Sequence, residues 1–219
     1  MAQAVLASAK AGLAGFEWGI GVPGTIGGSV RGNAGCFGGE IKDVVESVDS
    51  INLATLKDVR RTAPECGFSY RSSVFKENGG KEVIVSVVLK LNKGNGDEIK
   101  KAINEKIIYR TMRHPLEYPN IGSIFKNVRL TSVQRSQLPR VLSVVKHDPF
   151  SVVPTAYLIA QTGLKGVASG GAMVSPKHPN FIVNVLDATA EDVRSLISLV
   201  KTEVKREFEI DLEQEVQSV

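Results

Sequence analysis

The densest run of glycines in the sequence lies in the segment GIGVPGTIGGSVRGNAGCFGGE, residues 19–40. Glycines at this density indicate backbone at positive φ, or backbone pressed against a bulky neighbour. Main-chain N–H groups that no side chain obstructs can bind a pyrophosphate. The segment matches neither GxxxxGKS/T nor GxGxxG, so a tight, packed loop is the alternative reading. Thr25, Ser29 and Asn33 are its polar side chains that could hydrogen-bond a ligand.

Two further positions carry side chains suited to anion binding or proton transfer. Arg71 stands in CGFSYRSSVFK, where an arginine can bind a carboxylate or phosphate through two parallel donors, or simply face solvent from a strand. Ser123 stands in GSIFKN with Lys126 and Asn127 close behind it. A serine after a glycine is commonly a turn residue, and that alternative stays open for Ser123.

Near the C-terminus, Glu213 and Glu215 are separated by one residue, which on a strand places both on one face. Exposed edge charges are the alternative. The three histidines are scattered along the sequence and form no metal triad or nucleophile–base pair. Cys36 and Cys66 form no CxxC pair, so neither a disulfide framework nor a metal site is expected.

The composition is that of an ordinary globular protein of one or two domains, with 42% hydrophobic and 23% charged residues in 219. The net charge of +4 is spread along the chain, which disfavours a nucleic-acid partner and suits a small anionic ligand such as a diphosphate. No apolar run approaches the roughly 20 residues of a membrane span. The opening MAQAVLASAKAGLAGF lacks a basic start and predicts a helix, not a signal peptide. A cytoplasmic protein with no membrane partner is expected.

Hydrophobic periodicity and the positions of glycine and proline predict mixed helices and strands without a βαβ alternation, which favours the α+β class. Helices are expected at residues 3–14, 97–113, 155–164 and 189–208. Strands are expected at residues 44–53, 59–73, 82–92, 163–175, 180–187 and 210–216. The helix at 189–208 has a capping signature, Thr189 followed by Asp192, and an apolar stripe. The loop HPLEYPNIGS marks a domain boundary, with domains at residues 1–112 and 113–219.

Six ordered blocks resemble the flavin-dependent UDP-N-acetylenolpyruvoylglucosamine reductases (MurB). These blocks are GVPGTIGGSVRGNAGCFGGEI, ECGFSYRSSVFK, PLEYPNIGSIFKN, GLKGVASGGAMVSPKHPNFIVN, ATAEDV and LEQEV. They are spread along nearly the whole chain except residues 129–152, and the compact link into PLEYPNIGS resembles the shorter subtype of the family. The resemblance implies an incomplete FAD-binding domain of the PCMH type, followed by a MurB-type C-terminal substrate-binding domain.

The resemblance also implies an activity and its participants. The family uses NADPH to reduce FAD, and the flavin reduces the enolpyruvyl double bond of UDP-N-acetylglucosamine enolpyruvate, a step of peptidoglycan precursor synthesis. Ser123 resembles the serine that protonates the intermediate, and Arg71 and Glu215 resemble the pair that acts on the substrate carboxylate. Lys126 and Asn127 resemble positions near the diphosphate of the nucleotide sugar. The flavin contacts implied are Val22, Pro23, Gly24, Thr25, Gly27, Gly28, Ser29, Asn33, Gly35 and Gly38.

The sequence departs from the family pattern in three places. Family members begin with a region that carries a GxGSN-type flavin motif, and no such motif precedes Met1. An N-terminal flavin subdomain supplied elsewhere is therefore expected, and an inactive chain that retains only UDP-sugar or partner binding is the alternative to a reductase. The usual closing motif LEPEVR reads LEQEVQ, with Gln214 and Gln217 in place of proline and arginine. Residues 129–152 differ in length from the common members.

Overall fold

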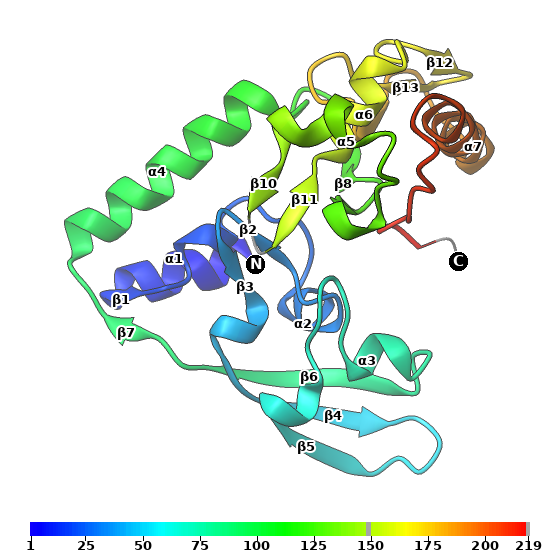
Figure 1. Ribbon diagram of the computed structural model, residues 1–219. Helices are drawn as coiled ribbons and strands as arrows, with labels where there is room; N and C mark the ends of the chain where they lie inside the picture. The colour runs from blue at the N-terminus through cyan, green and yellow to red at the C-terminus, as the bar shows by residue number, and fades with distance from the viewer. Residues whose placement is uncertain (148–149, 218–219) are drawn as a thin grey trace. The chain divides into compact units, whose positions relative to one another are not determined.

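The structure is a computed structural model that describes residues 1–147 and 150–217 (Figure 1). The chain divides into two compact units, Met1–Tyr109 and Arg110–Val219, and the division falls inside helix α4 (Gly96–Arg113). Every strand pairing in the described ranges is antiparallel. Helices and antiparallel sheets combined in this way confirm the α+β class. Within those ranges, no helix is both long and apolar enough to cross a membrane.

The first unit combines short helices with an antiparallel sheet in the order β5-β4-β6. Its helices are α1 (Ala2–Lys10), α2 (Ile26–Arg31), α3 (Val74–Glu77) and most of α4, with 3-10 turns η1 (Glu17–Gly19), η2 (Ile41–Asp43) and η3 (Pro64–Cys66). Its strands are β1 (Leu13–Ala14), β2 (Gly35–Cys36), β3 (Gly39–Glu40), β4 (Val45–Asn52), β5 (Asp58–Thr62), β6 (Glu82–Leu89) and β7 (Asn92–Lys93). Strand β1 pairs with β7, and β2 pairs with β3 in a hairpin.

Aromatic side chains fill the core of this unit. Phe16 and Trp18 are buried edge to face, with ring centroids 5.5 Å apart, and Phe75 is buried with them. Gly39 lies directly against the Trp18 ring, because a Cβ there would come within 2.3 Å of Trp18 Cδ1. The glycine run thus has a packing role at this position, as the alternative reading of the sequence allowed.

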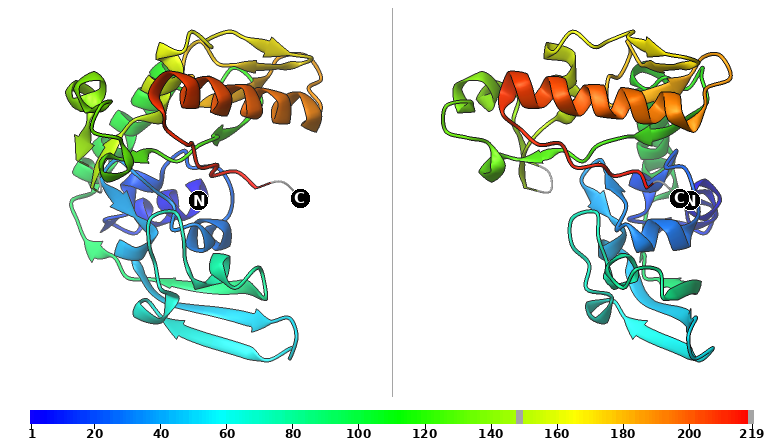
Figure 2. Two further views of the ribbon diagram at one scale, coloured as in Figure 1. Left: turned by 45° about the vertical axis from the view of Figure 1, so that its right-hand side comes forward. Right: turned by 90° about the vertical axis from the view of Figure 1, so that its right-hand side faces the viewer.

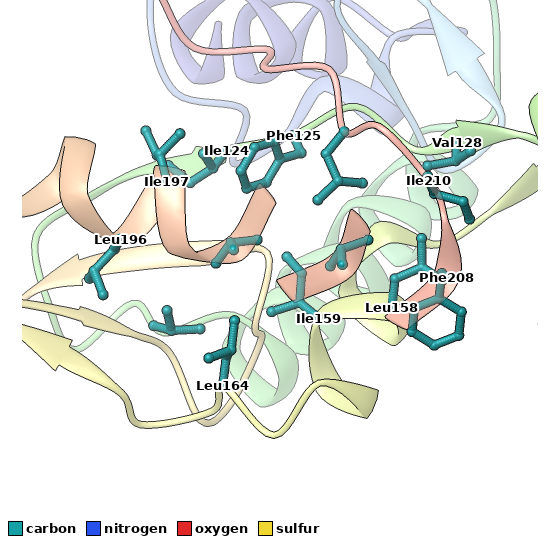
Figure 3. Close-up of a cluster of buried hydrophobic side chains, with 14 of the residues drawn as sticks. Ile124, Phe125, Val128, Leu158, Ile159, Leu164, Leu196, Ile197, Phe208 and Ile210 are labelled. Atoms are coloured by element: carbon teal, nitrogen blue, oxygen red, sulfur yellow. The ribbon is translucent and has the colours of Figure 1, made fainter. Parts of the chain in front are cut away.

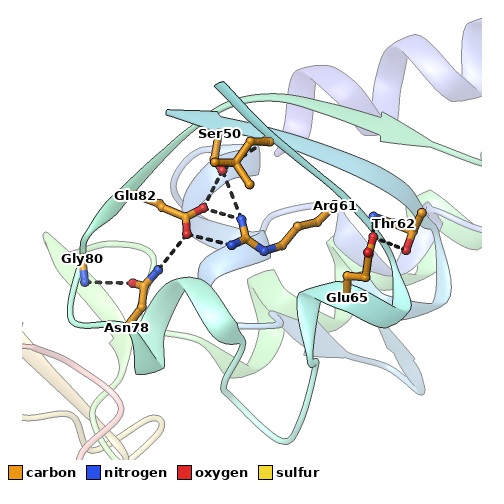
Figure 4. A network of polar contacts seen from close by, with 8 residues as sticks. Ser50, Arg61, Thr62, Glu65, Asn78, Gly80 and Glu82 are labelled. Atoms are coloured by element: carbon orange, nitrogen blue, oxygen red, sulfur yellow. Dashed lines mark hydrogen bonds and ion pairs between the residues drawn. The ribbon is translucent and has the colours of Figure 1, made fainter. Parts of the chain in front are cut away.

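An ion pair crosses the three-stranded sheet (Figure 4). Arg61 on β5 reaches over β4 to Glu82 on β6; its Nη2 donates to Glu82 Oε1 at 2.8 Å and its Nη1 pairs with Oε2. The Ser50 hydroxyl on β4 donates to the same carboxylate at 2.7 Å, and Asn78 donates at 3.4 Å. Although burial works in the opposite direction, the bonds from Arg61, Ser50 and Asn78 hold the pKa of Glu82 below its usual value. All three strands are thereby joined by side chains.

In the part of the second unit that the structure describes, the strands form two small sheets. Helices pack with them, as Figure 2 shows. One sheet has the order β12-β13-β14-β8, with β8 (Asn120–Ser123), β12 (Ala168–Ser169), β13 (Ala172–Val174) and β14 (Phe181–Asn184). The other has the order β10-β11-β9, with β9 (Val128–Arg129), β10 (Lys146–His147) and β11 (Ser151–Val153). The helices are α5 (Leu138–Val141), α6 (Thr155–Gln161) and α7 (Ala190–Phe208), with 3-10 turns η4 (Leu130–Ser132) and η5 (Leu142–Val144).

Helix α7 carries the apolar stripe that its sequence predicts. Its buried side chains, Leu196, Ile197, Val200, Val204 and Phe208, join the hydrophobic cluster of the second unit (Figure 3). The capping box at its start is confirmed, since Thr189 Oγ1 accepts from Asp192 N at 3.1 Å and Thr189 N donates to Asp192 Oδ2 at 2.8 Å.

Two strand predictions are wrong. Of residues 59–73, only the part within β5 is a strand, because Pro64 begins a 3-10 turn and Gly67 follows at φ +55°. Residues 210–216 do not form a strand, since a single bridge between Phe125 and Gln214 is their only strand-like pairing in the described structure. The first helix is also shorter than predicted and ends at Lys10.

The segment 129–152, which lies outside the blocks that resemble the family, contributes to the second unit through its described residues, 129–147 and 150–152. Val133, Val141 and Val152 are buried in its core. Arg140 Nη1 donates to the main-chain oxygen of Glu207 at 2.6 Å, and its guanidinium lies 4.4 Å from the centre of the Phe208 ring. The described part of this segment is therefore attached to the C-terminal end of α7.

Candidate functional site

In the second unit, the segment that follows β8 lies between two partners. Ser123, the last residue of β8, pairs with Phe181 of β14. On the other side, Glu215 N donates to Ile124 O at 2.8 Å and Lys126 N donates to Glu213 O at 2.9 Å. The structure therefore places the segment that carries Glu215 directly beside the backbone that carries Ser123 and Lys126.

The predicted substrate residues Lys126 and Asn127 are both engaged within the protein. The Lys126 ammonium pairs with Glu213, and its side chain is only 12% exposed. Asn127 Oδ1 accepts from Thr155 N at 3.1 Å at the start of α6, and the Thr155 hydroxyl donates to Lys126 O at 2.6 Å. Among the described contacts, neither of these side chains bonds to Ser123.

The bridge to the C-terminal segment explains why Gln214 can replace the proline of the family pattern. The two bridging hydrogen bonds use Glu213 O and Glu215 N and leave Gln214 N outside the ladder. A proline, which lacks the N–H, fits the same place. Gln214 adds a bond that proline cannot make, because its Oε1 accepts from Lys201 Nζ at 3.0 Å on α7.

Two histidines flank the same strand pair. His114 and His178 lie with ring centroids 5.4 Å apart, and both rings contact Phe181, the strand partner of Ser123. The pKa of His114 is lowered to about 4, mainly because the ring is buried. The nearby charges of Arg110, His178 and Lys177 lower it further. Burial, with a smaller contribution from Lys146, also lowers the pKa of His178 against the effect of its own backbone hydrogen bond. Both rings are therefore neutral near pH 7.

This neutrality predicts that acid destabilises the second unit. An unfolded histidine takes up a proton near pH 6.5, whereas folded His114 does so only near pH 4, so stability is complete above 6.5 and is lost as pH falls towards 4. Because His114 is only partly buried, we expect a loss of about 1–2 kcal/mol, well below the full value of the shift. Amide exchange of α7 between pH 7 and pH 4.5 measures it. His114→Phe keeps a ring in the cluster and should flatten the dependence; an unchanged slope would contradict the assignment.

In the first unit, the glycine-rich segment contains an exposed part and a buried part. Pro23, Gly24 and Thr25 are exposed, Gly24 has φ +92°, and the Thr25 hydroxyl accepts from Gly28 N at 3.1 Å to cap α2. Ser29 and Asn33 are buried. The turn at Pro23–Thr25 thus presents main chain that a ligand can approach, whereas Ser29 and Asn33 lie inside the fold.

The other predicted flavin residues in the same segment also serve the fold. Val22 packs at the edge of the core, and Gly27 lies against Ile84 of β6. At Gly35 a Cβ would come within 2.6 Å of Glu40 Cγ, so only glycine fits there. Gly38, at φ +80°, belongs to the exposed turn of the β2–β3 hairpin.

Arg71 faces this segment instead of standing alone. Its Nη2 donates to Gly35 O at 2.6 Å, its Nη1 donates to Asn33 O at 3.5 Å, and Nη1 lies 3.7 Å from Glu40 Oε1. Asn33 supports the same loop, since its Nδ2 donates to Ser69 O at 2.9 Å and its Oδ1 accepts from Lys42 N at 3.1 Å. Arg71 itself is in the left-handed region at φ +56°.

Sequence reasoning missed Glu40, the acid at the centre of this group. Its side chain is only 7% exposed, it pairs with Lys42 at 2.7 Å, and it raises the pKa of that lysine mainly through their hydrogen bond. The sequence offered one sign of Glu40, an acidic residue directly after the last glycines of the run, in GGE. An acid in that place would usually be interpreted as an exposed charge. In the described residues no three His, Cys, Asp or Glu side chains gather as a metal site.

Known proteins resemble this chain over nearly all its length. The family described as "UDP-N-acetylenolpyruvoylglucosamine reductase, C-terminal domain" matches residues 114–219. The UDP-N-acetylenolpyruvoylglucosamine reductase of Carboxydothermus hydrogenoformans is 41% identical over 95% of the chain and 61% of its own length. That of Thermosipho melanesiensis is 35% identical over 97% of the chain and 64% of its own length.

A solved structure gives the same result. The crystal structure of UDP-N-acetylenolpyruvylglucosamine reductase (MurB) from Thermus caldophilus superposes with a TM-score of 0.76 at 30% identity, covering 98% of the chain and 68% of that protein. The chain spans just over three fifths of the length of the curated relatives just named. With the fold and the ordered motifs described above, these similarities show that the chain belongs to the UDP-N-acetylenolpyruvoylglucosamine reductase (MurB) family.

Proposed function

We propose that the chain takes part in the reaction that its relatives are named for, the reduction of UDP-N-acetylglucosamine enolpyruvate to UDP-N-acetylmuramate. FAD and NADPH would be the cofactors, and the product would serve peptidoglycan synthesis. The observation that carries the proposal is the gathering of Ser123, Lys126 and Glu215 on adjacent backbone of the second unit. A hydroxyl, an ammonium and a carboxylate there suit a substrate that has a carboxylate, a diphosphate and a carbon to be protonated.

The chemistry of the reaction suggests roles for Ser123 and Lys126. Adding hydride to an enol ether that bears a carboxylate pushes negative charge onto that carboxylate, and fixed donors stabilise the charge better than water does. The α-carbon then needs a proton from a positioned acid, and Ser123, which precedes the residue bonded to Glu215 N, carries the hydroxyl for this task. Lys126, held by Glu213, supplies the positive charge for the diphosphate.

The residues of the glycine-rich segment fit a flavin in part. Exposed main chain at Pro23, Gly24 and Thr25 can approach a pyrophosphate without obstruction by side chains. Ser29 and Asn33 are buried, and we propose that they shape the loop instead of touching the cofactor. Bound FAD, once reduced by NADPH, would supply the hydride for the substrate. Arg71, through Gly35 O and Asn33 O, would hold this loop in shape.

Binding of substrate to the chain tests the proposal directly. We expect UDP-N-acetylglucosamine enolpyruvate to shift amide NMR signals of residues 121–127 and 213–216, because these residues surround Ser123 and Lys126. UDP-N-acetylglucosamine, which lacks the enolpyruvyl group, is the matched control and should shift fewer of them. Shifts confined to other regions, or none at millimolar ligand, would contradict the proposal. Binding without reduction in the FAD-loaded protein would favour the alternative of a UDP-sugar-binding chain.

Replacing Arg71 by lysine should damage function although the charge is kept. The Arg71 guanidinium reaches Gly35 O, Asn33 O and Glu40 together through separate N–H groups. The single ammonium of a lysine cannot contact all three. We expect a drop in FAD affinity or in substrate reduction of roughly tenfold or more, the worth of one to two charged hydrogen bonds. Stopped-flow absorbance of the flavin separates the two. Arg31→Lys, on the same glycine-rich segment, is the control; equal effects of both changes would remove Arg71 from this role.

A further inference from the structure

The backbone of Phe125, two residues beyond Ser123, is hydrogen-bonded by the side chain of Asn180 at both its N–H and its carbonyl. Asn180 Oδ1 accepts from Phe125 N at 3.1 Å and Asn180 Nδ2 donates to Phe125 O at 2.8 Å. The carboxamide thus makes both hydrogen bonds that a neighbouring peptide group would make in a sheet. The residue is only 4% exposed, so water does not replace these bonds.

This contact lies just beyond the end of the pairing between β8 and β14. Strand β14 pairs with β8 at Ser123, but the register shifts between Phe181 and Val183, and β8 ends at Ser123. Just beyond, Ile124 N still donates to the main-chain oxygen of Asn180 at 2.8 Å. The Asn180 side chain then takes over at Phe125, where main-chain pairing with β14 has stopped.

Phe125 is also the residue that faces the C-terminal segment. It bridges to Gln214, with Glu215 N bonded to Ile124 O and Glu213 O bonded to Lys126 N. Asn180 holds one edge of this backbone while the segment that carries Glu215 holds the other. A shift of Phe125 would therefore move Ser123, Lys126 and Glu215 relative to one another.

We propose that Asn180 is a positioning residue, whose carboxamide sets the backbone of Phe125 and through it the places of Ser123 and Glu215. The activity part of this inference rests on the proposed function; the structural part does not. An asparagine is required because it carries a donor and an acceptor side by side on a short, buried side chain. Aspartate keeps the acceptor, loses the donor when ionised, and places a charged oxygen against Phe125 O.

The activity test uses Asn180→Asp in the FAD-loaded protein, with each half reaction followed by flavin absorbance. At pH 8 we expect substrate reduction to fall roughly ten- to a hundredfold, while flavin reduction by NADPH stays at the parent rate. Substrate reduction should recover as pH falls, because a protonated aspartic acid regains a donor for Phe125 O and burial raises its pKa. The parent should show no such recovery.

Asn184→Asp, at the last residue of β14, is the matched control for Asn180, which directly precedes that strand. Among the described contacts, the Asn184 side chain uses only its acceptor: Ala188 N donates to Asn184 Oδ1 at 3.0 Å, and aspartate keeps that bond. It should therefore behave as the parent does. Asn180→Asp at the parent rate throughout the pH range, or an equal loss in both variants, would overturn the inference.

Two measurements on the 219-residue chain separate this inference from the proposed function. In the parent, scalar couplings across hydrogen bonds should join Asn180 Nδ2 to the Phe125 carbonyl and Phe125 N to the Asn180 side-chain carbonyl. Asn180→Ala should speed amide exchange at Phe125 and Lys126 at least roughly tenfold, and Asn184→Ala should not. If these couplings are absent in the parent, the inference that Asn180 holds the backbone of Phe125 is overturned, even if Asn180→Ala fails to fold. A parent with the couplings that never reduces substrate contradicts the proposed function alone.

Discussion

Replacing Ser123 by alanine is expected to slow substrate reduction by roughly 10²- to 10⁴-fold, the usual worth of a positioned general acid. Reduction of flavin by NADPH should stay at the parent rate, because Ser123 acts on the substrate carbon alone. Stopped-flow absorbance of the flavin follows both half reactions. Ser123→Cys, which keeps an acidic proton at similar size, should retain more activity than Ser123→Ala.

The structure also offers a control for this change. Ser136 is an exposed serine of the same unit, and Ser136→Ala should leave both half reactions unchanged. If Ser123 only shapes its turn, Ser123→Ala should weaken substrate binding and stability and disturb both half reactions. A Ser123→Ala protein that reduces substrate at the parent rate would remove Ser123 from the mechanism.

Replacing Arg61 by alanine should destabilise the first unit by about 3 kcal/mol, because it leaves the Glu82 carboxylate buried without its main partner. Glu82 is 6% exposed and Arg61 20%, so the lower end of the range for buried pairs is appropriate. Urea unfolding followed by fluorescence of Trp18, the chain's one tryptophan, reports on this unit because Trp18 lies in its core.

Arg60→Ala is the matched control, one residue away on the same strand. Arg60 is 67% exposed and lies 3.6 Å from Asp49, so its loss should cost about 0–1 kcal/mol. Changing both partners of the buried pair, Arg61→Met with Glu82→Leu, should be milder than Arg61→Ala because no charge is left unpaired. Equal losses from Arg60→Ala and Arg61→Ala would contradict the account of the sheet.

Features set by nearby residues were predicted well from the sequence. Helix α7 has its apolar stripe and its Thr189–Asp192 box within one stretch of chain, and both are present in the structure. The 97–113 helix is likewise confirmed as α4 to within one residue. Such patterns depend on spacing alone and need no knowledge of the tertiary fold.

Features that depend on distant partners could not be predicted in this way. Residues 210–216 have the composition of a strand, but among the residues that the structure describes they form a single bridge, at Phe125. The Arg71 guanidinium pairs with oxygens more than thirty residues earlier, and the buried Glu40 looked like an ordinary surface acid. The role of Asn180 could not be predicted from the residues around it, because its hydrogen-bond partner Phe125 is 55 residues away.

The candidate site came partly from residue chemistry and partly from resemblance. Ser123 and Glu215 were singled out one at a time, and the structure adds that Glu215 N bonds to the residue after Ser123. Their roles, and those of the flavin residues, remain predictions. The bonds described for Asn33 and Asn127 are internal, and their contact with a ligand stays a prediction.

One anaerobic experiment tests the central claim most directly. The FAD-loaded protein is reduced with NADPH, freed of excess NADPH, and mixed with UDP-N-acetylglucosamine enolpyruvate while flavin absorbance is followed and the product is identified by mass. We predict that the flavin reoxidises and that one UDP-N-acetylmuramate forms per flavin, with a solvent-derived deuterium at the α-carbon in D₂O. A flavin that stays reduced in the presence of bound substrate, with no such product, would contradict the account.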